Sequence, residues 1–233
     1  MGSSAYLLRQ LMGGEKHLQT DAGKTPLIFG VSGHRDPLPA AVPEIRAQLQ
    51  FIFSRFRAAY PDAPFELLSP LAEGADRLVA EVALACGAKL RVPLPLAQKE
   101  YEQDFPNADS LEEFRRMLAA AESSWEVPGA SGSSEAGGGQ VRADRYAEMG
   151  DFIARRSDVL LLLWDGRENN KKGGTAWVRK RREHWVGTKT ERAHEIDPSR
   201  YGRTIQIVTP RTTTEAVSGT RQRVEIIGDL PPG

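Results

Sequence analysis

Cysteine is almost absent from this chain: Cys86 is the only one in 233 residues. A single cysteine excludes an internal disulfide and is typical of a reducing compartment, so we expect a cytoplasmic protein. Long apolar runs are missing too, because no stretch approaches the roughly 18 to 20 apolar residues that span a bilayer. No apolar segment follows a basic amino terminus, as it would in a secretory signal. The sequence therefore predicts no direct membrane span.

Neither sign of charge is in excess, since 31 Lys and Arg stand against 31 Asp and Glu. A protein dedicated to nucleic acid usually carries a net positive charge, so the balance argues against tight nucleic-acid binding. The four histidines show no metal-ligand spacing and there is no cysteine pair, so we expect no metal. Nor is a G-x-S-x-G turn present. We expect no cofactor.

What the chain does contain is an alternation of short apolar runs and amphipathic segments. Strands are expected at Leu27–Val31, Phe65–Ser69, Lys89–Leu94, Ser124–Val127, Asp158–Trp164, Thr204–Val208 and Arg223–Ile227. Helices are expected at Val42–Tyr60, Ala72–Cys86, Ala97–Asp104, Ser110–Ala121, Arg142–Arg156 and Thr175–Trp185. This order predicts an α/β fold, a Rossmann-like doubly wound and mainly parallel sheet with helices on both faces. The apolar run before Asp165 is typical of its central strand.

The domain organisation follows from the same pattern. We expect a flexible arm at 1–25, one domain at 26–210 with a flexible glycine-rich loop at about 128–141, and an edge strand with a tail at 211–233. The tail is typical of a linker to a further domain and equally of a frayed end. Ser110 and Glu113 have the spacing of a capping box, which would begin a helix at Ser110.

A first candidate binding motif follows the first strand. It holds Gly30, Ser32, Gly33, His34 and Arg35 in a turn that leads into a helix. A strand, a turn of small residues and a helix together aim backbone N–H groups at an anion, most often a phosphate. Arg35 would add a planar fork of donors. The turn is not a G-x-G-x-x-G or a G-K-[ST] motif, so a merely tight turn is the alternative.

Two further motifs follow other strands. The second holds Ser69, Glu73, Gly74 and Asp76, where a carboxylate can accept from a sugar hydroxyl or simply stabilise a helix start. The third runs from Asp165 to Gly173, Gly174 and Thr175, where glycine amides at a helix start can bind an anion. The carboxyl ends of parallel strands meet at one edge of a sheet, so the three motifs predict one ligand site.

The order of the three motifs resembles the SLOG superfamily, which includes the DNA-processing protein A family and the LOG phosphoribohydrolases. Ser69-Pro-Leu-Ala-Glu-Gly-Ala-Asp76 is similar to the S-G-L-A-x-G-I-D stretch of the DNA-processing family. Gly173-Gly-Thr175 is similar to a reduced P-G-G-x-G-T-x-x-E motif of the LOG enzymes. The resemblance covers about residues 27 to 208 and implies a Rossmann-like fold.

The resemblance implies three functions. The LOG motif has its catalytic glutamate at the position of Val178. The missing carboxylate favours binding over hydrolysis of a nucleotide-derived ligand, such as a nucleotide second messenger or an ADP-ribose type of molecule. Similar SLOG domains are sensors in bacterial defence systems and regulate a fused or partner effector. The alternatives are a LOG-like phosphoribohydrolase or N-glycosidase, with Glu73, Asp76 or Asp165 as the catalytic carboxylate, and single-stranded DNA binding.

Partners are the least determined part of this interpretation. The resemblance implies a homo-oligomer, and Trp177 with Trp185 on the last helix would supply a contact surface. The basic run Arg179-Lys-Arg-Arg182 on the same helix would instead contact nucleic acid or attract a phosphate.

Overall fold

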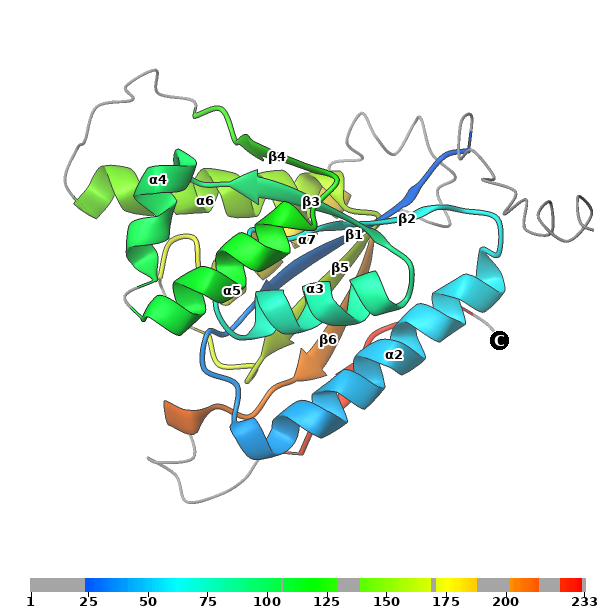
Figure 1. Ribbon diagram of the computed structural model, residues 1–233. Helices are drawn as coiled ribbons and strands as arrows, with labels where there is room; N and C mark the ends of the chain where they lie inside the picture. Colours follow the sequence, from blue (N-terminus) through cyan, green and yellow to red (C-terminus); the bar gives the residue numbers. More distant parts are fainter. Residues whose placement is uncertain are drawn as a thin grey trace, which may run out of the picture.

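The computed structural model describes residues 24–105, 107–129, 139–168, 171–187, 202–213 and 223–231 (Figure 1). Nearly all of the expected arm at 1–25 lies outside the described residues, as do 130–138 of the expected loop. The division into arm, domain and tail therefore stays a prediction. No helix among the described residues is long and apolar enough to cross a membrane.

The described residues form one seven-stranded sheet in the order β4-β3-β2-β1-β5-β6-β7. Its strands are β1 (Leu27–Gly33), β2 (Phe65–Leu68), β3 (Lys89–Leu94), β4 (Ser123–Glu126), β5 (Val159–Trp164), β6 (Arg203–Val208) and β7 (Ile226–Ile227). All pairs are parallel except β6 with β7, which is antiparallel. The chain builds outward from β1 to β4 and then returns to the other side of β1. The predicted doubly wound, mainly parallel sheet is confirmed.

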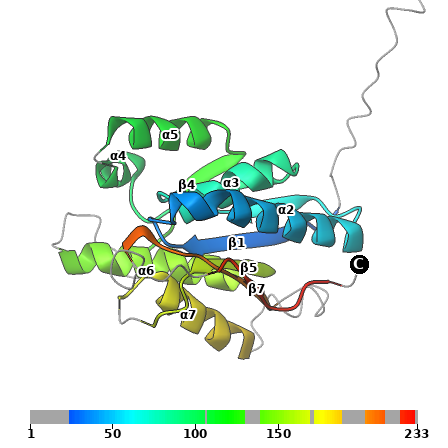
Figure 2. The ribbon, with the colours of Figure 1, turned by 90° about the horizontal axis from the view of Figure 1, so that it is seen from below.

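The helices lie on both faces of the sheet. They are η1 (Pro39–Ala41), α2 (Val42–Ala59), α3 (Ala75–Ala85), α4 (Gln98–Tyr101), η2 (Glu102–Asp104), α5 (Ala108–Ala119), α6 (Gly139–Arg156) and α7 (Thr175–Gly187). Figure 2 shows α2 and α3 above the sheet and α6 and α7 below it. This division follows from the return of the chain at β5, because right-handed crossovers put helices on opposite faces when the strand order reverses.

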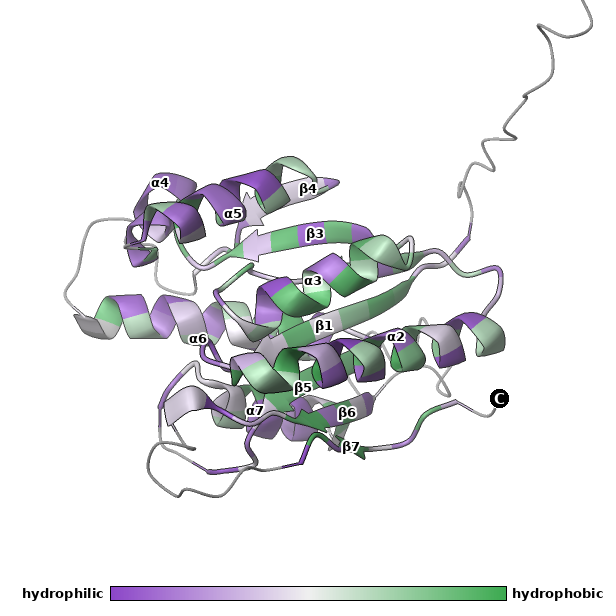
Figure 3. Cartoon of the chain, turned by 60° about the horizontal axis from the view of Figure 1, so that its bottom comes forward, coloured by the Kyte–Doolittle hydropathy of each residue, from purple (hydrophilic) through white to green (hydrophobic). Residues whose placement is uncertain are grey.

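Strand β5 is buried on both faces, as its unbroken apolar sequence predicts. Val159, Leu161 and Leu163 join the core beneath α2 and α3, while Leu160, Leu162 and Trp164 join the core beneath α6 and α7. The alternation follows from the two-residue period of a strand. In Figure 3 hydrophobic residues gather in the central strands, and the outward faces of the helices are hydrophilic. Strand β5 thus contributes side chains to both cores.

Three helix starts differ from the predictions by two residues or more. Helix α6 begins at Gly139, three residues earlier than expected and inside the segment predicted as a loop. Helix α3 begins at Ala75, three residues later than expected, because Gly74 has a φ of 75°, outside the helical region. Helix α5 begins at Ala108 with Asn107 as its cap, whose side chain accepts from the amide of Asp109 at 2.9 Å. The predicted capping box is therefore wrong.

The two residues of that predicted box serve another purpose. The Arg77 guanidinium donates to the Ser110 hydroxyl at 3.0 Å and to the Glu113 carboxylate at 2.6 Å. Arg77 itself is buried on α3. The contacts therefore tie α5 to α3, and they place the polar face of α5 beside the second motif.

Candidate functional site

A cavity of about 770 Å³ opens at the carboxyl ends of the parallel strands. It lies at the end of β1, which stands between β2 and β5 where the strand order reverses, and ligands bind at this place in open α/β sheets. Its walls come from the ends of β1 and β2, from α4 and η2, from α6, from the start of α7 and from the segment after β6. The polar side chains that line it are Ser32, His34, Arg35, Asp36, Asp76, Tyr101, Asp104, Arg142, Tyr146, Lys171, Lys172, Thr175, Arg211 and Thr213.

The first wall is the turn after β1. A Cβ on Gly33 would lie 2.4 Å from the Cβ of Ala75, so only glycine fits between β1 and α3. The His34 ring nitrogen Nε2 lies 3.1 Å from Oδ1 of Asp165. Burial lowers the pKa of His34, and the hydrogen bond to Asp165 opposes that effect. The histidine is therefore neutral at pH 7 and held toward β5.

Arg35 is the exposed cation of this turn, and its ion pair is loose. Its side chain is 43% exposed, and its ion pair with Asp104, 3.6 Å from Nη2 to Oδ2, is longer than a hydrogen bond. Asp36, by contrast, accepts from Arg211 at 2.8 Å and from the hydroxyl of Thr213 at 2.8 Å. These bonds fix the segment after β6 against the turn after β1. Arg35 is thus left to face the cavity.

The second motif spans the start of α3, and its residues lie in different surroundings. A Cβ on Gly74 would lie 2.4 Å from the carbonyl oxygen of Arg35, so the glycine lets the second loop touch the first. Ser69 is fully buried and donates to the carbonyl of Asp76 at 3.3 Å. Glu73 points away from the cavity and accepts from Ser110 at 2.5 Å. Of the four polar or glycine residues predicted here, only Asp76 lines the cavity, beside Pro70 and Ala72 of the same stretch.

The Asp76 carboxyl is strongly perturbed by its surroundings. Its side chain is buried, and Oδ1 has no hydrogen-bond partner. Burial raises its pKa to about 7, while the Arg35 guanidinium and the backbone amide of Ala72 oppose that rise. An unpaired carboxyl oxygen in a cavity wall is a typical feature of ligand sites.

The third motif forms the opposite wall. Gly173 has a φ of 76°, and a Cβ there would lie 3.0 Å from the amide nitrogen of Ala147 on α6. The Gly174 amide donates to the carbonyl of Lys171 at 3.1 Å. Thr175 then begins α7, whose first-turn amides lack partners within the helix. The Thr175 hydroxyl lies 3.5 Å from that of Ser32, so the third motif meets the first. These amides and the helix dipole together favour an anion in the cavity.

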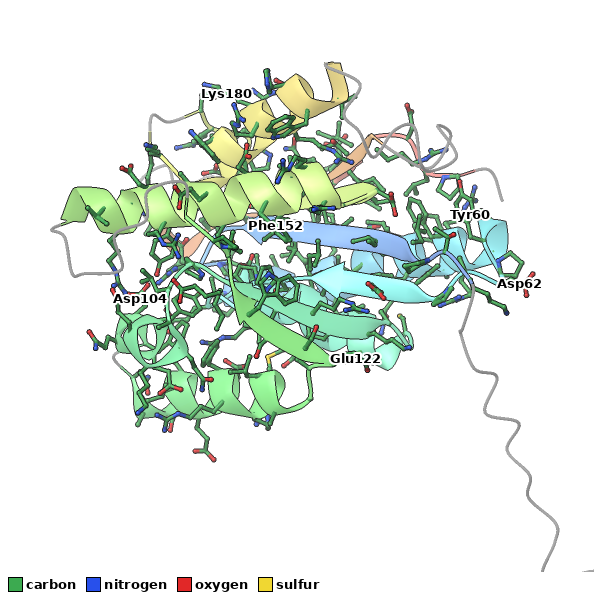
Figure 4. All side chains as sticks on the ribbon, turned by 90° about the horizontal axis from the view of Figure 1, so that it is seen from above. Tyr60, Asp62, Asp104, Glu122, Phe152 and Lys180 are labelled. Carbon is green, nitrogen blue, oxygen red and sulfur yellow. The ribbon has the colours of Figure 1, made fainter. Side chains whose placement is uncertain are left out.

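Residues that the sequence did not indicate complete the cavity. Asp104 accepts from Arg142 and from the Tyr146 hydroxyl, which joins η2 to the start of α6 (Figure 4). Tyr101 is fully buried on α4. Only Arg211 had a detectable signal, since it follows the end of β6 at the same sheet edge. The other four residues are brought to the cavity by the packing of helices that lie far apart in the sequence, and no local pattern indicates them.

The predicted site residues therefore fall into two sets. Lining the cavity are Ser32, Gly33, His34, Arg35, Asp76, Gly173, Gly174 and Thr175. Beside it, without lining it, lie Gly30, Ser69, Glu73, Gly74 and Asp165. Gly30 serves packing, because a Cβ there would lie 2.7 Å from Ile153 of α6. Val178, at the position of the LOG glutamate, lines the cavity with an apolar side chain.

The basic run of α7 does not form an open cationic surface. Arg179 pairs with Glu168 and Glu183, and Lys180 pairs with Glu168 at 3.0 Å. Arg181 pairs with Asp151. The prediction that the whole run contacts nucleic acid or attracts a phosphate is wrong for Arg182. This side chain is 1% exposed and donates to backbone carbonyls.

Within the described ranges, no three His, Cys, Asp or Glu side chains are arranged to hold a metal ion. The candidate site is therefore built from a helix start, glycine amides, arginines and a buried carboxyl. These groups suit an anionic organic ligand.

No protein-family model matches this chain, and no curated protein matches its sequence. Among solved structures, it is similar to DNA processing protein A (DprA) from Streptococcus pneumoniae, with 12% identity and a TM-score of 0.43, over 68% of this chain and 47% of that one. It is also similar to TM1055, with 13% identity and a TM-score of 0.40, over 69% of this chain and 70% of that one. At these identities the likeness concerns the fold alone.

Proposed function

We propose that this chain binds a nucleotide-derived ligand, a nucleotide second messenger or an ADP-ribose type of molecule, in the cavity at the strand ends. The observation that carries the proposal is the placement of the α7 start and the Arg35 guanidinium on walls of one cavity. Both favour an anion, and about 770 Å³ is enough for a ligand of nucleotide size. Phosphate groups would bind Arg35 and the amides of Gly173 and Thr175, because the Gly174 amide already donates to the carbonyl of Lys171.

Replacing Arg35 with alanine is expected to weaken binding of the best ligand by roughly 1.5 to 3 kcal/mol, the range for a hydrogen bond to a charged group. Calorimetric titration with a panel of cyclic and linear nucleotides and ADP-ribose would measure the effect. Arg46→Ala is the matched control, because Arg46 has similar exposure and pairs with Glu81, outside the residues that line the cavity. Equal affinity of wild type and Arg35→Ala would contradict the placement.

We further propose that the domain reports ligand binding to a fused or partner effector and self-associates while doing so. The support is that three separate chain segments meet at the cavity, so a ligand can draw them together. Light scattering with and without the best ligand would test it. An unchanged monomer in both states would contradict the self-association.

An N-glycosidase acting on nucleoside monophosphates is a second candidate, favoured by the buried Asp76 carboxyl. A carboxyl with a pKa of about 7 is half protonated at neutral pH, as a general acid requires. Val178 offers no carboxylate where the LOG motif has one, so binding without hydrolysis is the expected result. Incubation with nucleoside 5′-monophosphates should release no free base. Steady release that Asp76→Asn abolishes would establish the enzyme instead.

Single-stranded DNA binding is the third alternative. The ion pairs of Arg179, Lys180 and Arg181 leave α7 with little free positive charge. Tight binding to a phosphate backbone needs several such charges. We therefore expect no sub-micromolar, salt-sensitive shift of DNA near physiological salt.

A further inference from the structure

Two buried polar atoms in the cavity wall have no hydrogen-bond partner: Oδ1 of Asp76 and the hydroxyl of Tyr101. Asp76 is 5% exposed and Tyr101 is 0% exposed, and both line the cavity. They come from different elements, α3 and α4. The first is an acceptor in its ionised form, and the second is a donor.

The Tyr101 hydroxyl has no structural purpose that its ring does not already serve. The ring packs edge-on against Phe105 and Phe114, with centroids 5.1 and 5.6 Å away. A phenylalanine would make the same contacts without burying an unpaired hydroxyl, which is unfavourable. The hydroxyl therefore needs a partner that comes from outside the fold.

The two groups line the same cavity and act on each other electrostatically. Burial and then the Asp76 carboxylate raise the pKa of Tyr101, while Arg35 opposes the rise. Arg35 also opposes the pKa rise of Asp76. The acceptor, the donor and the uncommitted arginine thus face one region of the cavity.

We propose that Asp76 and Tyr101 form a subsite for an uncharged group that both donates and accepts, such as a sugar hydroxyl or the edge of a base where a donor stands beside an acceptor. Asp76 Oδ1 accepts the hydrogen bond of that group, and the Tyr101 hydroxyl donates one to it. The subsite rests on the proposed function, in which the same ligand places its anion at Arg35 and the α7 start. Affinity and specificity are thereby divided between two parts of the cavity.

The subsite is tested by titrating wild type and Tyr101→Phe with three probes: pyrophosphate, ribose 5-phosphate and adenosine. We expect Tyr101→Phe to weaken a probe that reaches the subsite roughly tenfold and to leave pyrophosphate unchanged. Weakened ribose 5-phosphate assigns a sugar hydroxyl. Weakened adenosine alone assigns a base edge. Asp76→Asn is expected to weaken the same probe tenfold or more, because a charged acceptor is lost.

A stability measurement without ligand gives an independent readout. Tyr101→Phe should leave the melting temperature equal or higher, because an unpaired hydroxyl is removed. Tyr146→Phe is the matched control in the same cavity, and it should lower the melting temperature, because its hydroxyl bonds to Asp104. A comparable fall in both variants would show that the Tyr101 hydroxyl has an internal partner and would overturn the subsite.

The outcomes also separate the subsite from the proposed function. If all probe affinities are the same in wild type and Tyr101→Phe, the subsite is wrong although the anion site stands. If wild type binds adenosine in a Tyr101-dependent way but no phosphorylated probe, the subsite stands and the nucleotide proposal is wrong. Failure of wild type to bind any of the three overturns both.

Discussion

Replacing Arg182 with methionine is expected to lower the free energy of unfolding by roughly 3 to 5 kcal/mol, because buried carbonyl oxygens lose a charged donor. Nη1 donates to the carbonyls of Ala154 and Ser157, each at 2.7 Å, and Nη2 donates to those of Asp158 and Arg203 at 2.8 and 3.1 Å. One guanidinium thus joins the end of α6, the turn before β5 and the start of β6. Methionine keeps the volume and leaves four carbonyls without their donor.

Denaturant unfolding of Arg182→Met beside Arg179→Met measures this effect. Arg179 lies on the same helix, but its pairs with Glu168 and Glu183 are at the surface, so its loss should change the unfolding free energy by about 1 kcal/mol or less. Arg182→Lys should restore only part of the loss, because one ammonium cannot replace a planar fork. Similar small losses at both arginines would mean that Arg182 is hydrated.

Position 182 shows what the sequence offered and what the prediction overlooked. Arg182 stands four residues after Val178, which is buried, and so lies on the same face of α7. The spacing alone therefore separates Arg182 from Arg179, Lys180 and Arg181. A run of four basic residues is nevertheless typical of a solvent-exposed segment, and this is why the prediction treated the four alike. A buried arginine becomes favourable only when backbone carbonyls from other elements surround it, and that arrangement is a tertiary property.

The sheet and the three strand-end motifs were predictable for a simple physical reason. Each depends on local sequence: an apolar run for β5, small residues at Gly33, and Gly173-Gly-Thr175 before a helix. The rest of the cavity could not be predicted in this way. Asp104 and Arg142 are separated by 38 residues and meet because α6 crosses back beneath the sheet. Glu73 likewise turned away from the cavity because Ser110 offered it a partner, which no local pattern indicates.

The buried Asp76 carboxyl leads to the second large effect, which is a stability that falls as the pH rises. In an unfolded chain this carboxyl loses its proton near pH 3.8, but in the folded protein it keeps the proton until about pH 7. Between these values the native state binds one proton more than the unfolded state, so raising the pH favours unfolding. The contribution is fully present below pH 3.8 and is lost as the pH rises through about 7.

Comparison with Asp76→Asn isolates this contribution, because all other titrating groups are shared. The stability of wild type relative to Asp76→Asn should fall by about 1.4 kcal/mol per pH unit across this window, or about 4 kcal/mol in total. Urea unfolding of both proteins at pH 4, 5, 6, 7 and 8 would measure the difference. Asp62→Asn, which removes an exposed carboxylate in the turn before β2, should show nearly the same difference from wild type at every pH. A difference between wild type and Asp76→Asn that stays constant from pH 4 to 8 would mean that water reaches the carboxyl, and Asp76 would then lose its place as the unpaired acceptor of the cavity.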